Sequence, residues 1–125
     1  MSEPRRGSIE PNVTFKDQLA SSEDGPIVLL NIFTVAPEDM QAMLDIWGED
    51  SGVMKRQPGF ISAQLHKGVA GTNVFVNYAI WESIEAFRNA HKNPEFQAVI
   101  ARTPASAVTQ PMLLKKIAVP GVCVA

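Results

Sequence analysis

The stretch that decides the fold is NVFVNYAIWESIEAFR, residues 73–88. Its first part is rich in β-branched and aromatic residues and predicts a strand over residues 74–82. Ser83 follows as a suitable helix N-cap with Glu85 in the first turn, which predicts a helix over residues 83–92. Asn77 stands in the middle of the apolar strand, where an amide costs free energy unless it has a partner. Its side chain therefore either bonds to backbone or meets a ligand.

The segments before this stretch predict three further elements. FISAQLHKG, residues 60–68, is typical of a strand, and the turn-rich VAGTN after it predicts an antiparallel hairpin with residues 74–82. IVLLNIFTV, residues 27–35, is apolar almost throughout and predicts a strand covered on both faces. Between these strands, Pro37 is expected to open a helix that runs to about Gln57.

The segments after it complete a β-α-β-β-α-β order. Asn93-Pro94-Glu95 predicts a second helical piece over residues 94–102, set at a bend from the first, and residues 111–119 predict the last strand. This order predicts an α+β, ferredoxin-like domain with an antiparallel sheet and helices on one face. We expect the domain over residues 27–119, a flexible N-terminal arm over residues 1–26 and a C-terminal tail over residues 120–125. Residues 13–19 of the arm are candidates for docking, locally or on a partner subunit.

The apolar strands also predict a partner. Both faces of the first and third strands are apolar, and an uncovered apolar sheet face of this size is rare on a monomer. A second copy packed sheet to sheet would bury it. The expected assembly is therefore a homodimer, a dimeric α/β barrel.

Composition excludes several other partners. The net charge is −2, from 11 basic and 13 acidic residues, so no basic excess favours nucleic acid or an anionic membrane. Cys123 is the one cysteine, which rules out a disulfide within the chain and favours a reducing compartment. No stretch approaches the roughly 20 apolar residues that a membrane span requires. We expect a cytoplasmic protein.

Alternation along the strand groups the candidate site residues. Asn77 and Trp81 fall on one face, about 7 Å apart at roughly 3.3 Å per residue. Phe87 of the following helix and Asn31 of the first strand are candidates to join them. Apolar walls with a few aimed polar groups suit a small aromatic ligand. The stripe Met40, Met43, Leu44, Trp47 and Met54 is predicted as core, although methionine also suits a pocket wall.

The run VNYAIWESIEAFR, residues 76–88, together with Pro-Gly-Phe at 58–60, resembles the antibiotic biosynthesis monooxygenase family. It is especially similar to the branch that oxidises polyketide phenols to quinones without a cofactor, and the resemblance covers about residues 27–118. It implies a cofactor-free monooxygenase that acts on an aromatic small molecule with O2. The resemblance implies Asn77 and Trp81 as catalytic residues, and it places Phe87 and Arg102 at positions that contribute in that branch. Together with Asn31, Trp47 and His91, these two complete the candidate substrate-binding residues. That branch carries a tyrosine at the position of Phe87, so a proton relay through its hydroxyl is lost here.

Alternative functions remain open at this point. A haem-degrading branch of the family needs a tryptophan where Ala90 stands and a histidine where Ile100 stands, which argues against haem degradation unless His91 ligates iron from a shifted register. His66 and His91 lack metal-ligand spacing, and we predict no metal and no cofactor. A non-catalytic binding or stress-response module would use the same fold. An isomerase or carbon–carbon lyase would need His66 or His91 as its base.

Overall fold

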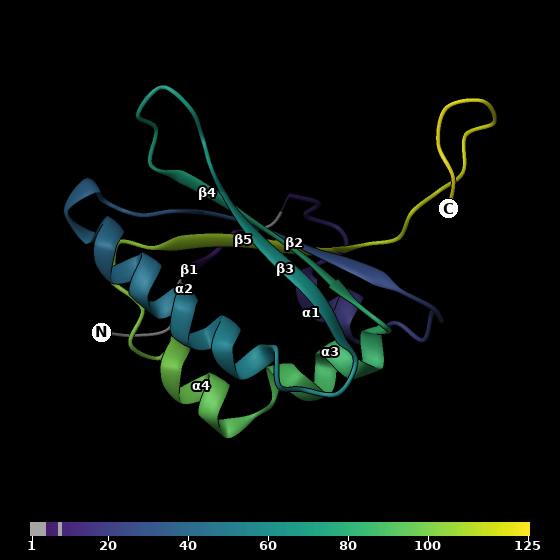
Figure 1. Cartoon of the computed structure of the whole chain (residues 1–125), viewed down its shortest axis with the longest axis horizontal. Helices are drawn as coiled ribbons and strands as arrows, with labels where there is room; N and C mark the ends of the chain where they lie inside the picture. The colour runs from purple at the N-terminus through teal and green to yellow at the C-terminus, as the bar shows by residue number, and fades with distance from the viewer. Residues whose placement is uncertain (1–4, 8) are drawn as a thin grey trace.

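The computed structural model describes residues 5–7 and 9–125 as a five-stranded sheet covered on one face by helices (Figure 1). The strand order is β1-β5-β2-β4-β3. The strands are β1 (Arg5–Arg6), β2 (Ile27–Thr34), β3 (Phe60–Lys67), β4 (Val74–Trp81) and β5 (Val108–Leu114). The helices are α1 (Phe15–Leu19), the short 3-10 turn η1 (Pro37–Asp39), α2 (Met40–Met54), α3 (Ile84–His91) and α4 (Pro94–Ile100).

The predicted ferredoxin-like order is confirmed. β2, α2, β3, β4, α3 with α4, and β5 follow one another along the chain, and the four strands pair in antiparallel fashion. β1 adds a short parallel edge beside β5. β2 and β4 occupy the centre of the sheet, so the residues expected to form the site lie on its two innermost strands.

The helix boundaries follow local capping chemistry. The Ser83 hydroxyl accepts from the Ala86 amide (3.0 Å) at the start of α3. The Asn93 side-chain oxygen accepts from the Glu95 amide (2.8 Å) and from the Phe96 amide at the start of α4. The predicted bend between the two helical pieces is thus present. α2 ends at Met54, three residues before the expected end.

The last strand differs from its prediction, because β5 begins at residue 108 and ends at residue 114. Pro111 lies inside it, opposite Asn31. The amide of Leu113, two residues on, points away from β2 and donates to the Gln18 side-chain oxygen (2.8 Å). The missing amide hydrogen of Pro111 faces the same edge, where a strand tolerates proline. Residues 115–125 leave the sheet and turn back at a bridge between Val119 and Cys123 (yellow in Figure 1).

The N-terminal segment holds a helix that sequence analysis did not predict. Thr14 and Asp17 form a reciprocal capping box at the start of α1. Arg88 of α3 ties down its end by donating to the Leu19 carbonyl (2.8 Å) and to the Ser21 carbonyl (3.2 Å). Part of the segment predicted as an arm therefore packs against α3 and β5.

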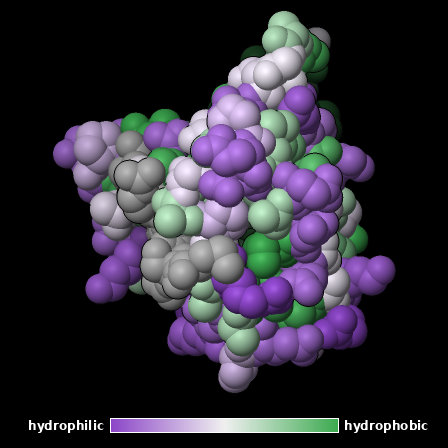
Figure 2. All heavy atoms as spheres, turned by 90° about the vertical axis from the view of Figure 1, so that its left-hand side faces the viewer, coloured by the Kyte–Doolittle hydropathy of each residue, from purple (hydrophilic) through white to green (hydrophobic). Residues whose placement is uncertain are grey.

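The two faces of the sheet differ. The helix side carries the core, which includes Phe33, Phe75 and Trp81. On the other face lie Leu30, Ile32, Val76 and Tyr78, with the Tyr78 residue 39% exposed, and no described helix covers them in Figure 1. At the end of the molecule shown in Figure 2, small hydrophobic patches lie between hydrophilic residues. Within residues 5–7 and 9–125, each helix is too short or too polar to cross a membrane.

Candidate functional site

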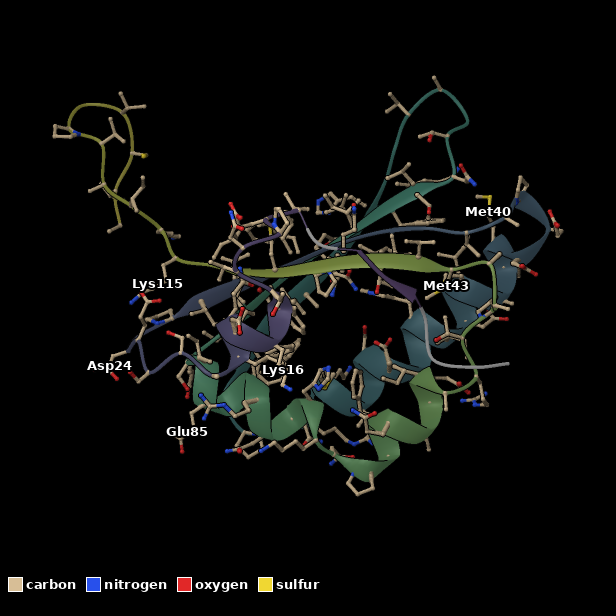
Figure 3. All side chains as sticks on the ribbon, turned by 180° about the vertical axis from the view of Figure 1, so that it is seen from behind. Lys16, Asp24, Met40, Met43, Glu85 and Lys115 are labelled. Carbon is tan, nitrogen blue, oxygen red and sulfur yellow. The ribbon has the colours of Figure 1, made fainter. Side chains whose placement is uncertain are left out.

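A cavity lies between the sheet and the helices that cover it. Its volume is about 110 Å³, several times the 10–15 Å³ or so that one water requires by a comparable measure. β2, β3, β4 and β5 supply its floor, α2 one wall, and α1, α3 and α4 further parts of its lining. Met43, labelled in Figure 3, lines it from α2. The space is somewhat smaller than the cavity of roughly 150 Å³ that is known to bind benzene.

Two amides occupy the floor of this cavity. Asn31 of β2 and Asn77 of β4 are direct cross-strand partners, and both line the cavity. Their side-chain oxygens are buried and have no hydrogen-bond partner among the residues that the structure describes. Backbone therefore does not satisfy the Asn77 oxygen, and an acceptor buried in this way costs about 1–3 kcal/mol unless something donates to it. The site is built to receive hydrogen-bond donors.

One wall comes from a single face of α2. Met43, Trp47, Asp50 and Met54 follow one another at helical spacing and all line the cavity. The indole N–H of Trp47 is buried and also lacks a partner in the described part of the chain. Three unsatisfied polar atoms, two acceptors on the floor and one donor on the wall, thus border one space whose other walls are mainly apolar.

Asp50 is a charged residue of the cavity wall that sequence reasoning missed. Its carboxylate lines the cavity and accepts a hydrogen bond from the Ser51 hydroxyl (3.1 Å). Burial raises the pKa of Asp50 to about 7, and the Ser51 hydrogen bond opposes that shift. A signal was present in the sequence, because Asp50 falls on the apolar stripe between Trp47 and Met54.

Trp81 is both a core residue and part of the cavity wall. It is 1% exposed. Its ring meets Phe60 and Phe87 edge to face, at centroid distances of 5.3 and 5.5 Å. These contacts hold the indole and the Phe87 ring in fixed positions at one end of the cavity.

His91 extends this aromatic wall on α3 and lines the cavity. Its ring lies 5.8 Å from Phe87, 5.5 Å from Phe96 of α4 and 6.1 Å from Phe15 of α1. Phe15 also lines the cavity. A helix far away in the sequence therefore contributes a wall that sequence reasoning did not anticipate.

Arg102 lies outside the cavity, unlike the other six residues expected at the site. α4 ends at Ile100, whose side chain lines the cavity, and Arg102 lies beyond that end, where it pairs with Glu49 on α2. Its side chain is about half exposed. Thr103 lines the cavity in its place. The predicted role of Arg102 in substrate binding has no support from this position.

The structure also places the residues on which haem or metal binding would depend. Ala90 is buried, and the aliphatic Ile100 on the cavity wall offers no atom that ligates iron. His66 is exposed on β3, with its ring nitrogen 3.3 Å from the Val76 carbonyl oxygen. Among the described residues, no group of three His, Cys, Asp or Glu side chains is arranged to hold a metal ion.

Comparison with known proteins places this geometry among relatives. The family model for antibiotic biosynthesis monooxygenase matches residues 26–102. SnoaB, a cofactor-independent oxygenase from Streptomyces nogalater, is 25% identical with a TM-score of 0.66, over 78% of this chain and 98% of SnoaB. A Shewanella loihica protein is 28% identical with a TM-score of 0.64, over 78% of this chain and all of that one. PA3566 from Pseudomonas aeruginosa shares the fold at 16% identity and a TM-score of 0.67, over 78% and 100% of the two chains. No curated protein matches the sequence.

Proposed function

Because the chain belongs to the antibiotic biosynthesis monooxygenase family, we propose that it is a cofactor-independent monooxygenase that oxidises a phenol or hydroquinone to a quinone. The observation that carries the proposal is the set of three buried polar atoms that lack a partner among the described residues and border a mainly apolar cavity: Asn31 Oδ1, Asn77 Oδ1 and Trp47 Nε1. The likeness to SnoaB, itself a cofactor-independent oxygenase, supports the class of reaction.

The polar atoms fit a hydroxylated ring. A phenolic O–H can donate to one of the two amide oxygens, and a second oxygen on the ring can accept from the Trp47 indole. Aromatic side chains such as Trp81 and Phe87 suit the faces and edges of a flat ligand. A molecule with one donor and one acceptor on an aromatic frame, such as a hydroxyanthrone, would satisfy atoms that protein leaves unsatisfied.

The reaction needs little more than a held phenolate and oxygen. Triplet O2 reacts slowly with a neutral singlet phenol, but an electron-rich phenolate can transfer one electron to it. The resulting phenoxyl radical and superoxide combine at a ring carbon to give a peroxide. Loss of the ring hydrogen as a proton, with cleavage of the O–O bond, then yields a quinone and water. The net change is one phenol plus one O2 to one quinone plus one H2O.

The side chains of the cavity assist these reaction steps by positioning the ligand and by stabilising charge. The Trp47 N–H is placed to stabilise negative charge on the ligand oxygen. Asn77 holds the ring against the floor, and its amide is also the proposed partner of the peroxide. Trp81 keeps water from the end of the cavity, and its indole is proposed to face the same peroxide. Fixed donors of this kind are typically worth roughly 3–4 kcal/mol of activation free energy each.

The test is oxygen uptake by the purified protein without added cofactor, with anthrone or a naphthol as substrate. We expect consumption of O2 and formation of the quinone in a 1:1 ratio, and a loss of at least about 10²-fold in the Asn77→Ala, Trp81→Phe double variant. Unchanged turnover in that variant would overturn the roles given to both residues. Tight binding of the phenols without turnover would favour a non-catalytic binding module.

We also propose that two copies pack through the sheet face opposite the cavity. Leu30, Ile32 and Val76 form an apolar strip on that face, beside the partly exposed Tyr78. Burying it removes an apolar surface that a monomer rarely leaves uncovered. Each cavity would then lie on the outer side of the dimer.

A further inference from the structure

We propose that Asp50 is the general base of this cavity and takes the phenolic proton of the ligand before oxygen reacts. This inference rests on the proposed oxidation of a phenol. It adds a residue that the sequence resemblance does not point to. It also narrows the class of ligand to molecules that carry an ionisable hydroxyl group and can place that group against the α2 wall.

The geometry of α2 carries the proposal. Asp50 lines the cavity one helical turn after Trp47, and residues three apart on a helix lie about 5–6 Å apart at their β-carbons. Its carboxylate accepts from the Ser51 hydroxyl, and within residues 5–7 and 9–125 no second side chain donates to it. A ligand hydroxyl at this wall would meet an acceptor carboxylate and the unpartnered indole N–H together.

The chemistry of the cavity requires such a group. Phenolate is the species that reduces O2, yet an apolar cavity disfavours ionisation of a neutral phenol. An amide oxygen is a very weak base and the indole nitrogen has no accessible lone pair, so Asn31, Asn77 and Trp47 can bind a proton donor or an anion but cannot remove a proton. Of the described residues, Asp50 and His91 are the two titratable side chains that line the cavity, and Asp50 lies one helical turn from the unpartnered Trp47 indole.

The proton balance closes over the full reaction. The phenol O–H bond breaks, its proton goes to an oxygen of Asp50, and the electron pair stays on the ligand as phenolate. After the peroxide forms, Asp50 returns this proton to the terminal peroxide oxygen. The carboxylate then accepts the ring C–H proton as the O–O bond breaks, and delivers it to the departing hydroxide as water. Asp50 ends in the state in which it began, and O2 is the oxidant.

The charges around Asp50 fit this role. On α2 itself, Glu49 is paired with Arg102 beyond the end of α4, and Arg56 just past α2 is paired with Glu95 on α4. Both pairs are more than half exposed, outside the cavity. Among the described residues, His91 of α3 is the other titratable group that lines the cavity with Asp50, and burial raises the pKa of Asp50 to about 7. A base with a pKa near the working pH is the most effective.

A fluorescence experiment tests the proton transfer without turnover. 2-Naphthol becomes a strong acid in its excited state and emits as naphtholate only where a base accepts its proton. With the ligand bound anaerobically, we expect naphtholate emission that rises with pH with a midpoint near 7, and its loss in Asp50→Asn. Equal naphtholate emission in the variant, or emission independent of pH in the wild type, would overturn the proposal. The Asp45→Asn variant, on the exposed side of α2, is the matched control and is expected to behave as wild type.

Aerobic kinetics separates this inference from the proposed function. Asp50→Asn is expected to lower kcat by about 10²-fold or more. In the wild type, kcat should rise with pH around a midpoint of about 7, and in the variant this midpoint should move up to the pKa of the free phenol. The Ser51→Ala variant keeps Asp50 and removes the hydrogen bond that lowers the pKa of Asp50. The midpoint of the rise in kcat with pH should therefore move to a higher pH. Oxygen uptake that Asp50→Asn leaves unchanged would overturn the base while sparing the oxidation. No oxygen uptake by the wild type, with naphtholate emission intact, would overturn the oxidation while sparing Asp50 as the proton acceptor.

Discussion

Asn31 and Asn77 face each other across the two central strands, and no group within residues 5–7 and 9–125 forms a hydrogen bond to the buried side-chain oxygen of either. Apolar side chains at these positions would be less costly for folding, because each unsatisfied acceptor costs about 1–3 kcal/mol. A stability cost concentrated in a cavity is typical of sites that evolution keeps for binding or catalysis.

Replacing Asn77 with leucine should therefore separate activity from stability. We expect oxygen uptake to fall by about 10²-fold, while the free energy of unfolding stays the same or rises by about 1 kcal/mol. Urea denaturation and an oxygen electrode measure the two quantities. The matched control is Asn73→Ala, because Asn73 lies outside the cavity and its side chain donates to the Val35 carbonyl. The Asn73→Ala variant should lose stability and keep its oxygen uptake. If Asn77→Leu lost stability and kept activity, or Asn73→Ala lost activity and kept stability, the role given to Asn77 would be contradicted.

The Trp47→Phe variant isolates the indole N–H. The ring that packs in α2 is largely retained, so the loss of stability should be small, while the donor to the ligand oxygen disappears. We expect the dissociation constant of a hydroxyanthrone to rise about 10-fold, since a lost hydrogen bond to a charged group is worth about 1.5–3 kcal/mol. Titration calorimetry under nitrogen gives this constant. An affinity equal to wild type would place the ligand elsewhere.

Asp50→Asn should stabilise the protein in a pH-dependent way. The Asp50 pKa is about 7 in the folded chain and about 3.9 in an unfolded one. Between these values the folded protein holds a proton that the unfolded chain has lost, so wild-type stability falls as pH rises from about 4 to 7. The Asp50→Asn variant has no carboxylate at this position, so its free energy of unfolding does not fall over this pH range for this reason. Its advantage should grow from near zero at pH 4 to on the order of 3 kcal/mol at pH 8. Urea unfolding of both proteins at the two pH values measures it, and a constant difference would contradict the raised pKa.

Phe15→Ala should widen the range of ligands. Phe15 closes one side of the cavity from α1, in edge contact with Phe87 at 6.2 Å. Removing its ring should raise kcat/KM for a three-ring phenol relative to a two-ring phenol by about 10-fold, as expected from a few methylenes of pocket space. Val13→Ala is the control, because Val13 is half exposed and lies outside this cavity. An unchanged ratio would show that α1 does not contact substrate.

The proposed dimer makes a hydrodynamic prediction. Sedimentation at micromolar protein should give about twice the chain mass of 13.6 kDa, and Tyr78→Lys on the open sheet face should shift the equilibrium to monomer. Lys92→Glu, on the helix side after α3, should leave the dimer intact. A wild-type protein that sediments as a stable monomer would contradict the sheet-to-sheet interface.

The fold was largely readable from the sequence, because its signals are local. Strand alternation, the proline before α2 and the caps at Ser83 and Asn93 each act within a few residues, and the structure confirms the elements they predict. The last strand was misplaced because Pro111 reads as a strand boundary. Only tertiary structure reveals that its missing amide hydrogen faces an edge that β1 does not reach.

The site was readable only in part. Alternation places Asn31 and Asn77 on defined faces, but the register that sets them opposite each other depends on how β2 and β4 pair. Asp50 was missed because a carboxylate in a helix is ordinarily exposed, although its spacing from Trp47 is that of a buried position. Phe15 reaches the cavity through contacts with residues more than 70 positions away, which no local pattern contains.

The walls of the cavity come from two sources. The amide floor and the α2 wall lie within residues 26–102, the span shared with the family, whereas Phe15, Thr103, Thr109 and Pro111 reach the cavity from outside it. Chemistry and selectivity can then diverge separately along the chain. On the proposed function, the flanking segments would tune which molecule the shared floor accepts, and grafting the α1 segment of this chain onto a relative becomes a route to a different range of substrates.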